Sequence, residues 1–152
     1  MNIKVYHTGR LSSELLRDLV DKERDIHCDC GWRKWEMPVF AEYGRNYILE
    51  VDGEFTGSAQ LIRGWDEPGV AYLAGFGIAP DKQNSGFGSV FIKEIVRQSA
   101  GDGFTAIELS VKPENAPALK IYGDAGFKQK ESHNSRYGPG EDRLIMRLDI
   151  NE

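Results

Sequence analysis

From residue 70 to residue 111 the chain reads VAYLAGFGIAPDKQNSGFGSVFIKEIVRQSAGDGFTAIELSV, and this stretch decides the fold. The apolar runs at 70–78 and 104–111 have the length and composition of strands. Between them, apolar residues recur with helical spacing from 91 to 96, which predicts a helix over about 86–100. A strand, a helix and a second strand in this order form a right-handed crossover unit, so the two strands are expected to be parallel.

The flanking segments predict antiparallel strands and further helices. Residues 47–51 and 55–62 surround Asp52-Gly53, a dipeptide that favours a hairpin turn. The other expected elements are an edge strand at 2–7, a helix from Ser12 or Ser13 to about Val20 that the charged run 21–25 ends, a broken helix or ordered loop at 27–44, a helix at 115–125, and a closing hairpin of strands from Phe127 and at 144–150. The expected fold class is α/β, with a mixed, mostly antiparallel sheet and one parallel pair.

Length and composition restrict the class of protein. The 152 residues are expected to form a single domain over residues 1–152. Hydrophobic residues make up 40% and charged residues 28%, and no apolar run approaches the ~20 residues of a membrane helix, so no membrane partner is expected. The 19 Lys and Arg against 24 Asp and Glu give a net charge of −5, which argues against nucleic-acid binding and weakly favours a cationic partner.

Two cysteines, Cys28 and Cys30, are present, and the amino terminus does not resemble a signal peptide. We therefore expect a cytoplasmic protein with free thiols. His27 and Asp29 extend the pair to a cluster of possible metal ligands, but no second Cys or His pair follows at zinc-site spacing. An ordinary loop is the favoured interpretation, and no metal is expected.

The loop Gln83-Asn84-Ser85-Gly86-Phe87-Gly88-Ser89 leads into the amino end of the predicted helix. Its two glycines let backbone amides crowd together, and with the positive end of the helix dipole they favour an anion such as phosphate. A glycine-rich turn without a ligand is the alternative. The third glycine of the dinucleotide fingerprint and the Gly-Lys-Ser/Thr ending of a nucleoside-triphosphate loop are absent.

Two further features stand near this loop in the predicted fold. Gly75 and Gly77 interrupt the preceding strand, which indicates either a close backbone approach that exposes amides or room for a bulky neighbour. Asn115, Ala118 and Tyr122 share one face of the later helix, where an extended ligand could end at the phenol. A capping asparagine and a half-buried tyrosine are the alternative.

Together these features resemble the GNAT superfamily of N-acetyltransferases, which bind acyl-coenzyme A. The residues Gln83-x-x-Gly86-x-Gly88 match the pyrophosphate motif Gln/Arg-x-x-Gly-x-Gly/Ala of that family. The residues Asn115-x-x-Ala118-x-x-x-Tyr122-x-x-x-Gly126-Phe127 match its later motif, after a strand at 107–111 of the usual type. The resemblance covers about residues 47–129 and implies a GNAT-like fold in which the parallel strands splay.

The resemblance implies acetyl-CoA as the co-substrate. The backbone amides from Gly86 to Ser89 would hold its pyrophosphate, and those from Phe76 to Ile78 would hold its pantetheine arm, which lies like an added strand. Many members carry basic residues just before the first motif glycine, where this chain has Asn84 and Ser85, so the site would rely more on amides. The implied cofactor-binding residues are Phe76, Gly77, Ile78, Gln83, Asn84, Ser85, Gly86, Phe87, Gly88, Ser89, Asn115, Ala118 and Tyr122.

The same resemblance implies direct attack of an amine on the thioester, without an acyl-enzyme. Tyr122 would protonate the departing thiolate, and a strand amide near Gly77 or Ile78 would meet the oxyanion. The amine is mostly protonated at pH 7, so a base is needed, and Glu108 is expected to serve. A solvent-facing or structural glutamate is the alternative, and the remaining candidates are Glu50, Asp66 and Glu67.

The acceptor is expected to be a small-molecule or peptide amine. Trp32, Trp35 and Trp65 lie near several acids and could hold a cation by stacking and charge, although a core role is the alternative for each. A polyamine or amino-sugar fits this interpretation, while a protein amino terminus or lysine stays open. A homodimer is expected because such dimers are frequent in the family, and a non-catalytic acyl-CoA sensor or interaction module is the competing function.

Overall fold

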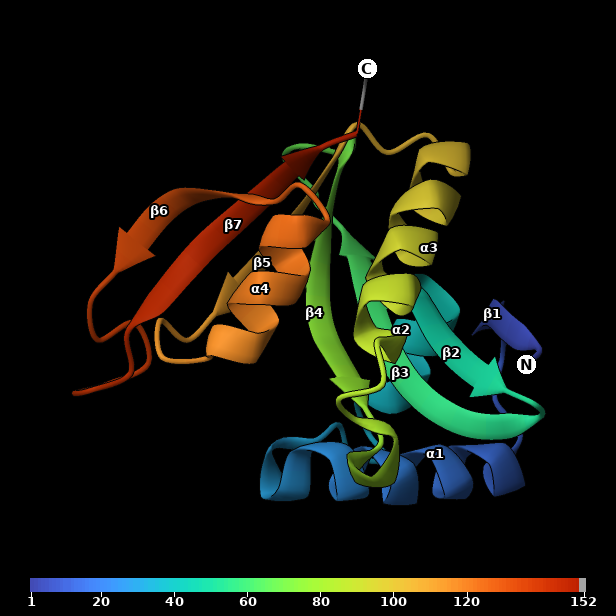
Figure 1. Cartoon of the computed structure of the whole chain (residues 1–152). Helices are drawn as coiled ribbons and strands as arrows, with labels where there is room; N and C mark the ends of the chain where they lie inside the picture. The colour runs from blue at the N-terminus through green and yellow to red at the C-terminus, as the bar shows by residue number, and fades with distance from the viewer. Residues whose placement is uncertain (151–152) are drawn as a thin grey trace. The chain divides into compact units, whose positions relative to one another are not determined.

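The structure is a computed structural model that describes residues 1–150, and Figure 1 shows its helices and strands in chain order. The elements are β1 (Ile3–Thr8), α1 (Ser13–His27), the 3-10 helix η1 (Cys28–Cys30), α2 (Met37–Tyr43), β2 (Arg45–Val51), β3 (Glu54–Arg63), β4 (Val70–Ile78), the 3-10 helix η2 (Pro80–Lys82), α3 (Phe87–Gly101), β5 (Ala106–Val111), α4 (Ala116–Asp124), β6 (Lys128–His133) and β7 (Arg143–Asp149). None of these helices is long and apolar enough to cross a membrane.

The strands within residues 1–150 are hydrogen-bonded in the order β1-β2-β3-β4-β5-β7-β6. Strands β4 and β5 pair in parallel, while β1 with β2, β2 with β3, β5 with β7, and β6 with β7 pair antiparallel. The crossover through α3 therefore produces the parallel pair that the sequence predicted. The mixed, mostly antiparallel α/β class is confirmed.

The chain divides into two compact units. Unit 1 contains Met1–Ile62 and Ala74–Phe91, and unit 2 contains Arg63–Leu73 and the described chain from Ile92 onward. The boundary passes through β4 and through α3, so each of these elements contributes to both units.

Unit 1 is built around the β2–β3 hairpin. Asp52 and Gly53 have positive φ angles of 52° and 84°, the backbone that a two-residue hairpin turn requires, and the predicted turn is confirmed. Strand β1 pairs with β2 from Ile3–Val51 to Thr8–Asn46 at one end of the strand order, which confirms the expected edge strand. The largest fully buried apolar side chains of this unit are Met37, Tyr47, Leu49, Leu61 and Phe91.

Helix α1 is longer than the sequence predicted. An end near Val20 was expected, but the helix runs to His27. The carboxylate of Asp18 accepts a hydrogen bond of 2.6 Å from Lys22, a pairing across one turn that supports an exposed helix. Glu23, within the charged run, is only 1% exposed. The charged run therefore continues the helix: Lys22 and Arg24 form ion pairs on its surface, and Glu23 packs inward.

Unit 2 is organised by β5. Its register with the first half of β4 runs from Val70–Ala106 to Leu73–Leu109, and its other edge pairs with β7. Strands β6 and β7 form the closing hairpin that the sequence predicted. The buried apolar side chains include Ile92 and Ile95 of α3, Ile107 and Leu109 of β5, and Phe127 and Met146.

Candidate functional site

The loop at 83–89 has the backbone that an anion site needs. Asn84 and Gly86 have φ angles of 61° and 81°, so the chain turns sharply before α3 begins at Phe87. The side-chain amide of Gln83 donates to the carbonyl of Ile78 at 3.1 Å and ties the loop to the end of β4. The first amides of α3 have no partner within the helix. A Cβ added to Gly86 would meet nothing within 4 Å, so this side of the loop is open.

The lysine beside this loop is already paired. Lys82 Nζ lies 2.8 Å from the carboxylate of Glu54 on β3. This hydrogen bond and the charge of Glu54 raise the pKa of Lys82, so the group stays a cation. With its nearest lysine held by a carboxylate, the loop offers an anion mainly backbone amides and the dipole of α3.

The second half of β4 packs closely against its unit. The ring of Phe76 stacks on Phe91 of α3 with centroids 5.4 Å apart. On β3, a Cβ added to Gly57 would lie 2.6 Å from the carbonyl oxygen of Gly77, so only glycine fits there. The amide of Ala79 donates to the carbonyl of Thr56 at 2.8 Å. The backbone at 76–78 is therefore firmly held.

Gly75 and Gly77 leave room for bulky neighbours. The sequence allowed this interpretation beside that of a backbone approach that exposes amides. A Cβ on Gly75 would contact Gln60 and would lie 2.7 Å from Trp32 Nε1. A Cβ on Gly77 would lie 2.9 Å from His27 Nε2. The glycines let the end of α1 and the following loop approach the strand backbone.

A buried polar cluster, which the sequence reasoning missed, lies beside these glycines. Glu23, Asn46, Ser58 and Gln60 are each 2% exposed or less. Ser58 Oγ donates to Glu23 Oε1, and Gln60 Nε2 lies 3.2 Å from the same oxygen and 2.9 Å from Asn46 Oδ1. Trp32 Nε1 donates to Gln60 Oε1 at 2.8 Å. The signal available in the sequence was Glu23 one turn after the buried Leu19, with the polar residues Thr56, Ser58 and Gln60 at alternating positions of one strand.

In unit 2, helix α4 presents the second predicted motif. Asn115 is the N-cap, and its Oδ1 accepts from the amide of Ala118 at 3.2 Å. Tyr122 is 8% exposed, and its ring lies 5.7 Å from that of Phe127. Burial raises the pKa of Tyr122 well above its ordinary value. The phenol is therefore a proton donor rather than a phenolate.

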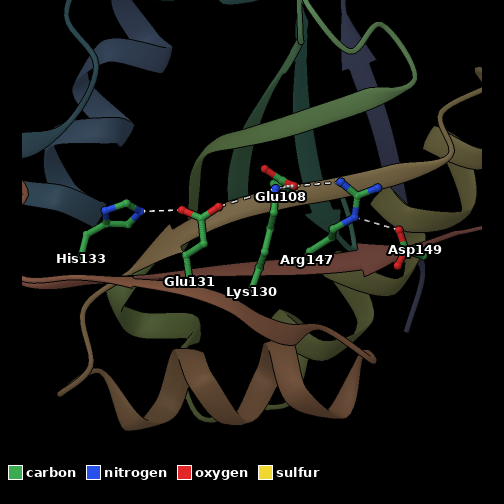
Figure 2. A network of polar contacts seen from close by, with 6 residues as sticks. All are labelled: Glu108, Lys130, Glu131, His133, Arg147 and Asp149. Atoms are coloured by element: carbon green, nitrogen blue, oxygen red, sulfur yellow. Dashed lines mark hydrogen bonds and ion pairs between the residues drawn. The ribbon is translucent and has the colours of Figure 1, made fainter.

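Glu108 is the centre of an ion-pair network on β5, β6 and β7 (Figure 2). Its Oε1 lies 2.8 Å from Lys130 Nζ and 2.9 Å from Arg147 Nη1. Burial favours the neutral acid, but the hydrogen bonds from the two cations outweigh it and lower the pKa of Glu108. A carboxylate held in this way is a weak proton acceptor. Of the other acids named as candidates, Glu50 accepts from Tyr6 at 2.7 Å, and Asp66 and Glu67 are exposed.

Replacing Glu108 with Gln is expected to lower the free energy of unfolding at pH 7 by up to about 1 kcal/mol. The native pKa of Glu108 is lowered, so its ion pairs stabilise the fold above the unfolded value of about 4.3 and are lost as the pH falls through the lower native value. The stability gap between wild type and variant should therefore close under acid. Urea unfolding at pH 7 and pH 3 measures it, with the exposed Glu114→Gln as control. A gap that persists unchanged at pH 3 would contradict this assignment.

The tryptophans differ from one another in exposure. Trp32 is half-buried, Trp35 is 73% exposed, and Trp65 is 97% exposed in the β3–β4 turn, so a core role is wrong for the last two. A pocket of about 420 Å³ in unit 1 is lined by residues that include Arg24, Asp29, Trp32, Arg33, Lys34 and Trp35. Lys34 Nζ lies 4.7 Å from the centre of the Trp35 ring. Three cations against one carboxylate give this pocket a positive lining, opposite to what a cationic acceptor needs.

The cysteines lie next to this pocket in the chain. Cys28 and Cys30 are free and exposed. Within residues 1–150, no three His, Cys, Asp or Glu side chains are grouped so that they could hold a metal ion.

Known proteins resemble this chain in sequence and in fold. The ribosomal protein bS18-alanine N-acetyltransferase of Escherichia coli (strain K12) is 27% identical over 123 residues, which cover 76% of this chain and 81% of that protein. The crystal structure of the ribosomal-protein-S18-alanine N-acetyltransferase from Escherichia coli superposes with a TM-score of 0.83 at 21% identity and covers 99% of this chain and 96% of that one. A Bacillus subtilis acetyltransferase in complex with CoA superposes with a TM-score of 0.77 at 15% identity, covering 97% and 99%.

The family match extends across both compact units. Residues 11–127 match the acetyltransferase (GNAT) family, and this range includes the loop at 83–89 and the motif on α4. The likeness to solved structures independently supports the fold. The chain is therefore a member of the acetyltransferase (GNAT) family.

Proposed function

We propose that this protein is an acetyl-CoA-dependent N-acetyltransferase that moves an acetyl group to a primary amine by direct attack. The observation that carries the proposal is the loop at 83–89, which turns through two left-handed residues and opens onto the amino end of α3. In a member of this family, such a loop fits the pyrophosphate of coenzyme A. The similar Bacillus subtilis fold with bound CoA supports the same co-substrate.

Each unit contains residues that the family resemblance implies for acetyl-CoA. In unit 1, the amides from Gly86 to Ser89 hold the pyrophosphate, and the backbone from Phe76 to Ile78 holds the pantetheine arm. In unit 2, Asn115 provides a polar side chain at the start of α4, and Ala118 provides a small side chain that a ligand can approach closely. The support is the close packing of the backbone at 76–78 against β3 and the capped first turn of α4.

Tyr122 is the proposed general acid. The free amine nitrogen bonds to the thioester carbon, the bond from that carbon to sulfur breaks, and the phenol of Tyr122 gives its proton to the sulfur. The nitrogen of the new amide releases its extra proton and the Tyr122 phenolate takes up a proton, so the products are the amide and the free thiol. Burial raises the pKa of Tyr122, so the phenol keeps its proton throughout the neutral range and has one to give when the thiolate departs. A backbone amide near Gly77 or Ile78 would stabilise the oxyanion that forms on the carbonyl oxygen.

The sequence predicted that Glu108 is the base, but the residues around it indicate a different role. Lys130 and Arg147 stabilise its charged form, which reduces its tendency to take a proton. We therefore propose that Glu108 has an ion-pair role and that another residue of the chain accepts the proton.

The proposed acceptor class is supported by the relatives and by the charge of the unit 1 pocket. A positive lining opposes a polyamine, with several positive charges, more strongly than a peptide amino terminus, with a single one. A relative acts on the alanine of ribosomal protein bS18, as its name states. We therefore propose that the acceptor is a peptide α-amine rather than a polyamine or an amino-sugar.

A thiol-release assay with acetyl-CoA tests the function over an amine panel that contains an alanine-initiated peptide, a polyamine and an amino-sugar. Calorimetry on the same samples measures binding of acetyl-CoA. We expect binding together with thiol release on the peptide. Binding without thiol release on any acceptor would favour the sensor alternative, and absence of binding would refute the proposed co-substrate.

Replacing Gly86 with Ala is expected to weaken acetyl-CoA binding by about 10-fold, because an L residue at φ 81° costs about 1–2 kcal/mol and is relieved by moving the loop amides. The measurement is calorimetry with acetyl-CoA. Gly103→Ala is the matched control, since Gly103 has φ 85° at the other end of α3 and the same strain there should leave affinity unchanged. Equal effects of the two substitutions on affinity would contradict a phosphate role for the loop.

A further inference from the structure

Helix α1 ends with an imidazole against strand β4. A Cβ added to Gly77 would lie 2.9 Å from His27 Nε2, so the imidazole ring packs against the backbone of β4. The His27 side chain is 29% exposed and therefore open to a ligand or solvent. Under the proposed function, Gly77 belongs to the segment that receives the thioester arm. His27 therefore lies beside the segment proposed to hold the thioester, where a residue that takes a proton from the acceptor amine is needed.

A buried carboxylate lies behind this imidazole. Glu23 is 1% exposed, and its Oε1 takes hydrogen bonds from Ser58 and Gln60. Its Oε2 is buried without a hydrogen-bond donor among the described residues, and His27 Nε2 lies 3.8 Å from it. A buried charge without a compensating partner is costly. A proton on His27 would supply the missing positive charge.

We propose that His27 accepts the proton of the acceptor amine and that Glu23 is its positioning residue. The inference rests on the proposed function. The nitrogen–hydrogen bond of the ammonium breaks, the proton passes to the imidazole nitrogen, and the nitrogen lone pair that is released attacks the thioester carbon. The imidazolium then pairs with the carboxylate of Glu23, and the proton later leaves to solvent.

The surroundings of His27 and Glu108 have opposite electrostatic effects. Two cations stabilise the charged form of Glu108 and oppose uptake of a proton. A neighbouring carboxylate favours the protonated form of an imidazole. Helix α1 faces His27 with Glu23, and strand β4 faces it with the uncharged backbone of Gly77. The structure therefore places a carboxylate beside His27 and two cations beside Glu108.

The test compares His27→Gln, Glu23→Gln and Glu108→Gln in the full chain, using the alanine-initiated peptide and saturating acetyl-CoA from pH 6 to pH 10. We expect His27→Gln to lower kcat about 100-fold at pH 7 while acetyl-CoA affinity stays unchanged. Its deficit should shrink toward pH 10, where the free amine needs no base. Glu23→Gln should lower kcat at pH 7 without changing the KM for the peptide, because the imidazole loses the carboxylate that positions it, and Glu23→Asp should restore part of the loss. Glu108→Gln should not reproduce the pH-dependent deficit of His27→Gln.

A second measurement does not depend on how well the His27 variant folds. The three histidines are His7, His27 and His133, so the His7→Gln/His133→Gln double variant keeps His27 alone. We expect diethyl pyrocarbonate to abolish its activity and hydroxylamine to restore it. Full activity after modification, or a wild-type pH profile in His27→Gln, would overturn the proposal. Failure of the wild type to release any thiol would instead refute the proposed function.

Discussion

Replacing Tyr122 with Phe is expected to lower kcat about 100-fold or more, with little change in acetyl-CoA affinity. Phenylalanine keeps the ring that packs 5.7 Å from Phe127, so the fold and the shape of α4 should persist. The substitution removes only the phenolic proton that the thiolate needs as it departs. A thiol-release assay and calorimetry with acetyl-CoA measure the two quantities separately.

The pH dependence of the wild type gives a second readout of Tyr122. An ordinary tyrosine ionises near pH 10, but burial raises the pKa of Tyr122 well above that value. The acid therefore stays protonated, and we expect no alkaline loss of kcat from this group up to about pH 10. Tyr137→Phe is the matched control, because Tyr137 is 59% exposed in the same unit. Unchanged turnover of Tyr122→Phe at every pH would remove the phenol from the mechanism.

Replacing Phe91 with Ala is expected to lower the free energy of unfolding by about 3–5 kcal/mol. Phe91 is 0% exposed, and its ring stacks on that of Phe76 with centroids 5.4 Å apart. The ring also lies close to β3, because a Cβ added to Gly57 would be 3.5 Å from it. Removing the ring leaves a cavity behind the second half of β4. This loss is a large share of the total stability of a domain.

Urea unfolding measures the effect of this substitution. Val90→Ala is the control on the same helix, because Val90 is 41% exposed and its truncation should cost well under 1 kcal/mol. In the Phe91 variant we also expect weaker acetyl-CoA binding, since Phe91 supports both the backbone at 76–78 and the first turns of α3. Equal stability of the two variants would show that the Phe91 ring does not anchor this part of the unit.

The elements with regular periodicity could be predicted well from the sequence. Strand β4 has the predicted bounds, and the Asp52-Gly53 turn and the parallel β4–β5 pair are confirmed. These features depend on local backbone preference and on the order of elements, both of which the sequence contains. The end of α1 was predicted wrongly, because charged residues do not by themselves end a helix, and here Lys22 pairs with Asp18 while Glu23 packs inward.

The two family motifs, the glycine loop and the order of strands and helices are properties of the sequence alone, because each depends on spacing along the chain. The tertiary structure decided the partners of the charged groups. Sequence alternation indicated Glu108 as an available base, yet Lys130 and Arg147 reach it from other strands. The tertiary structure also brings Glu23 and His27 to Gly77. The sequence could not show this arrangement, because residues far apart in the chain acquire their electrostatic surroundings only when they pack together.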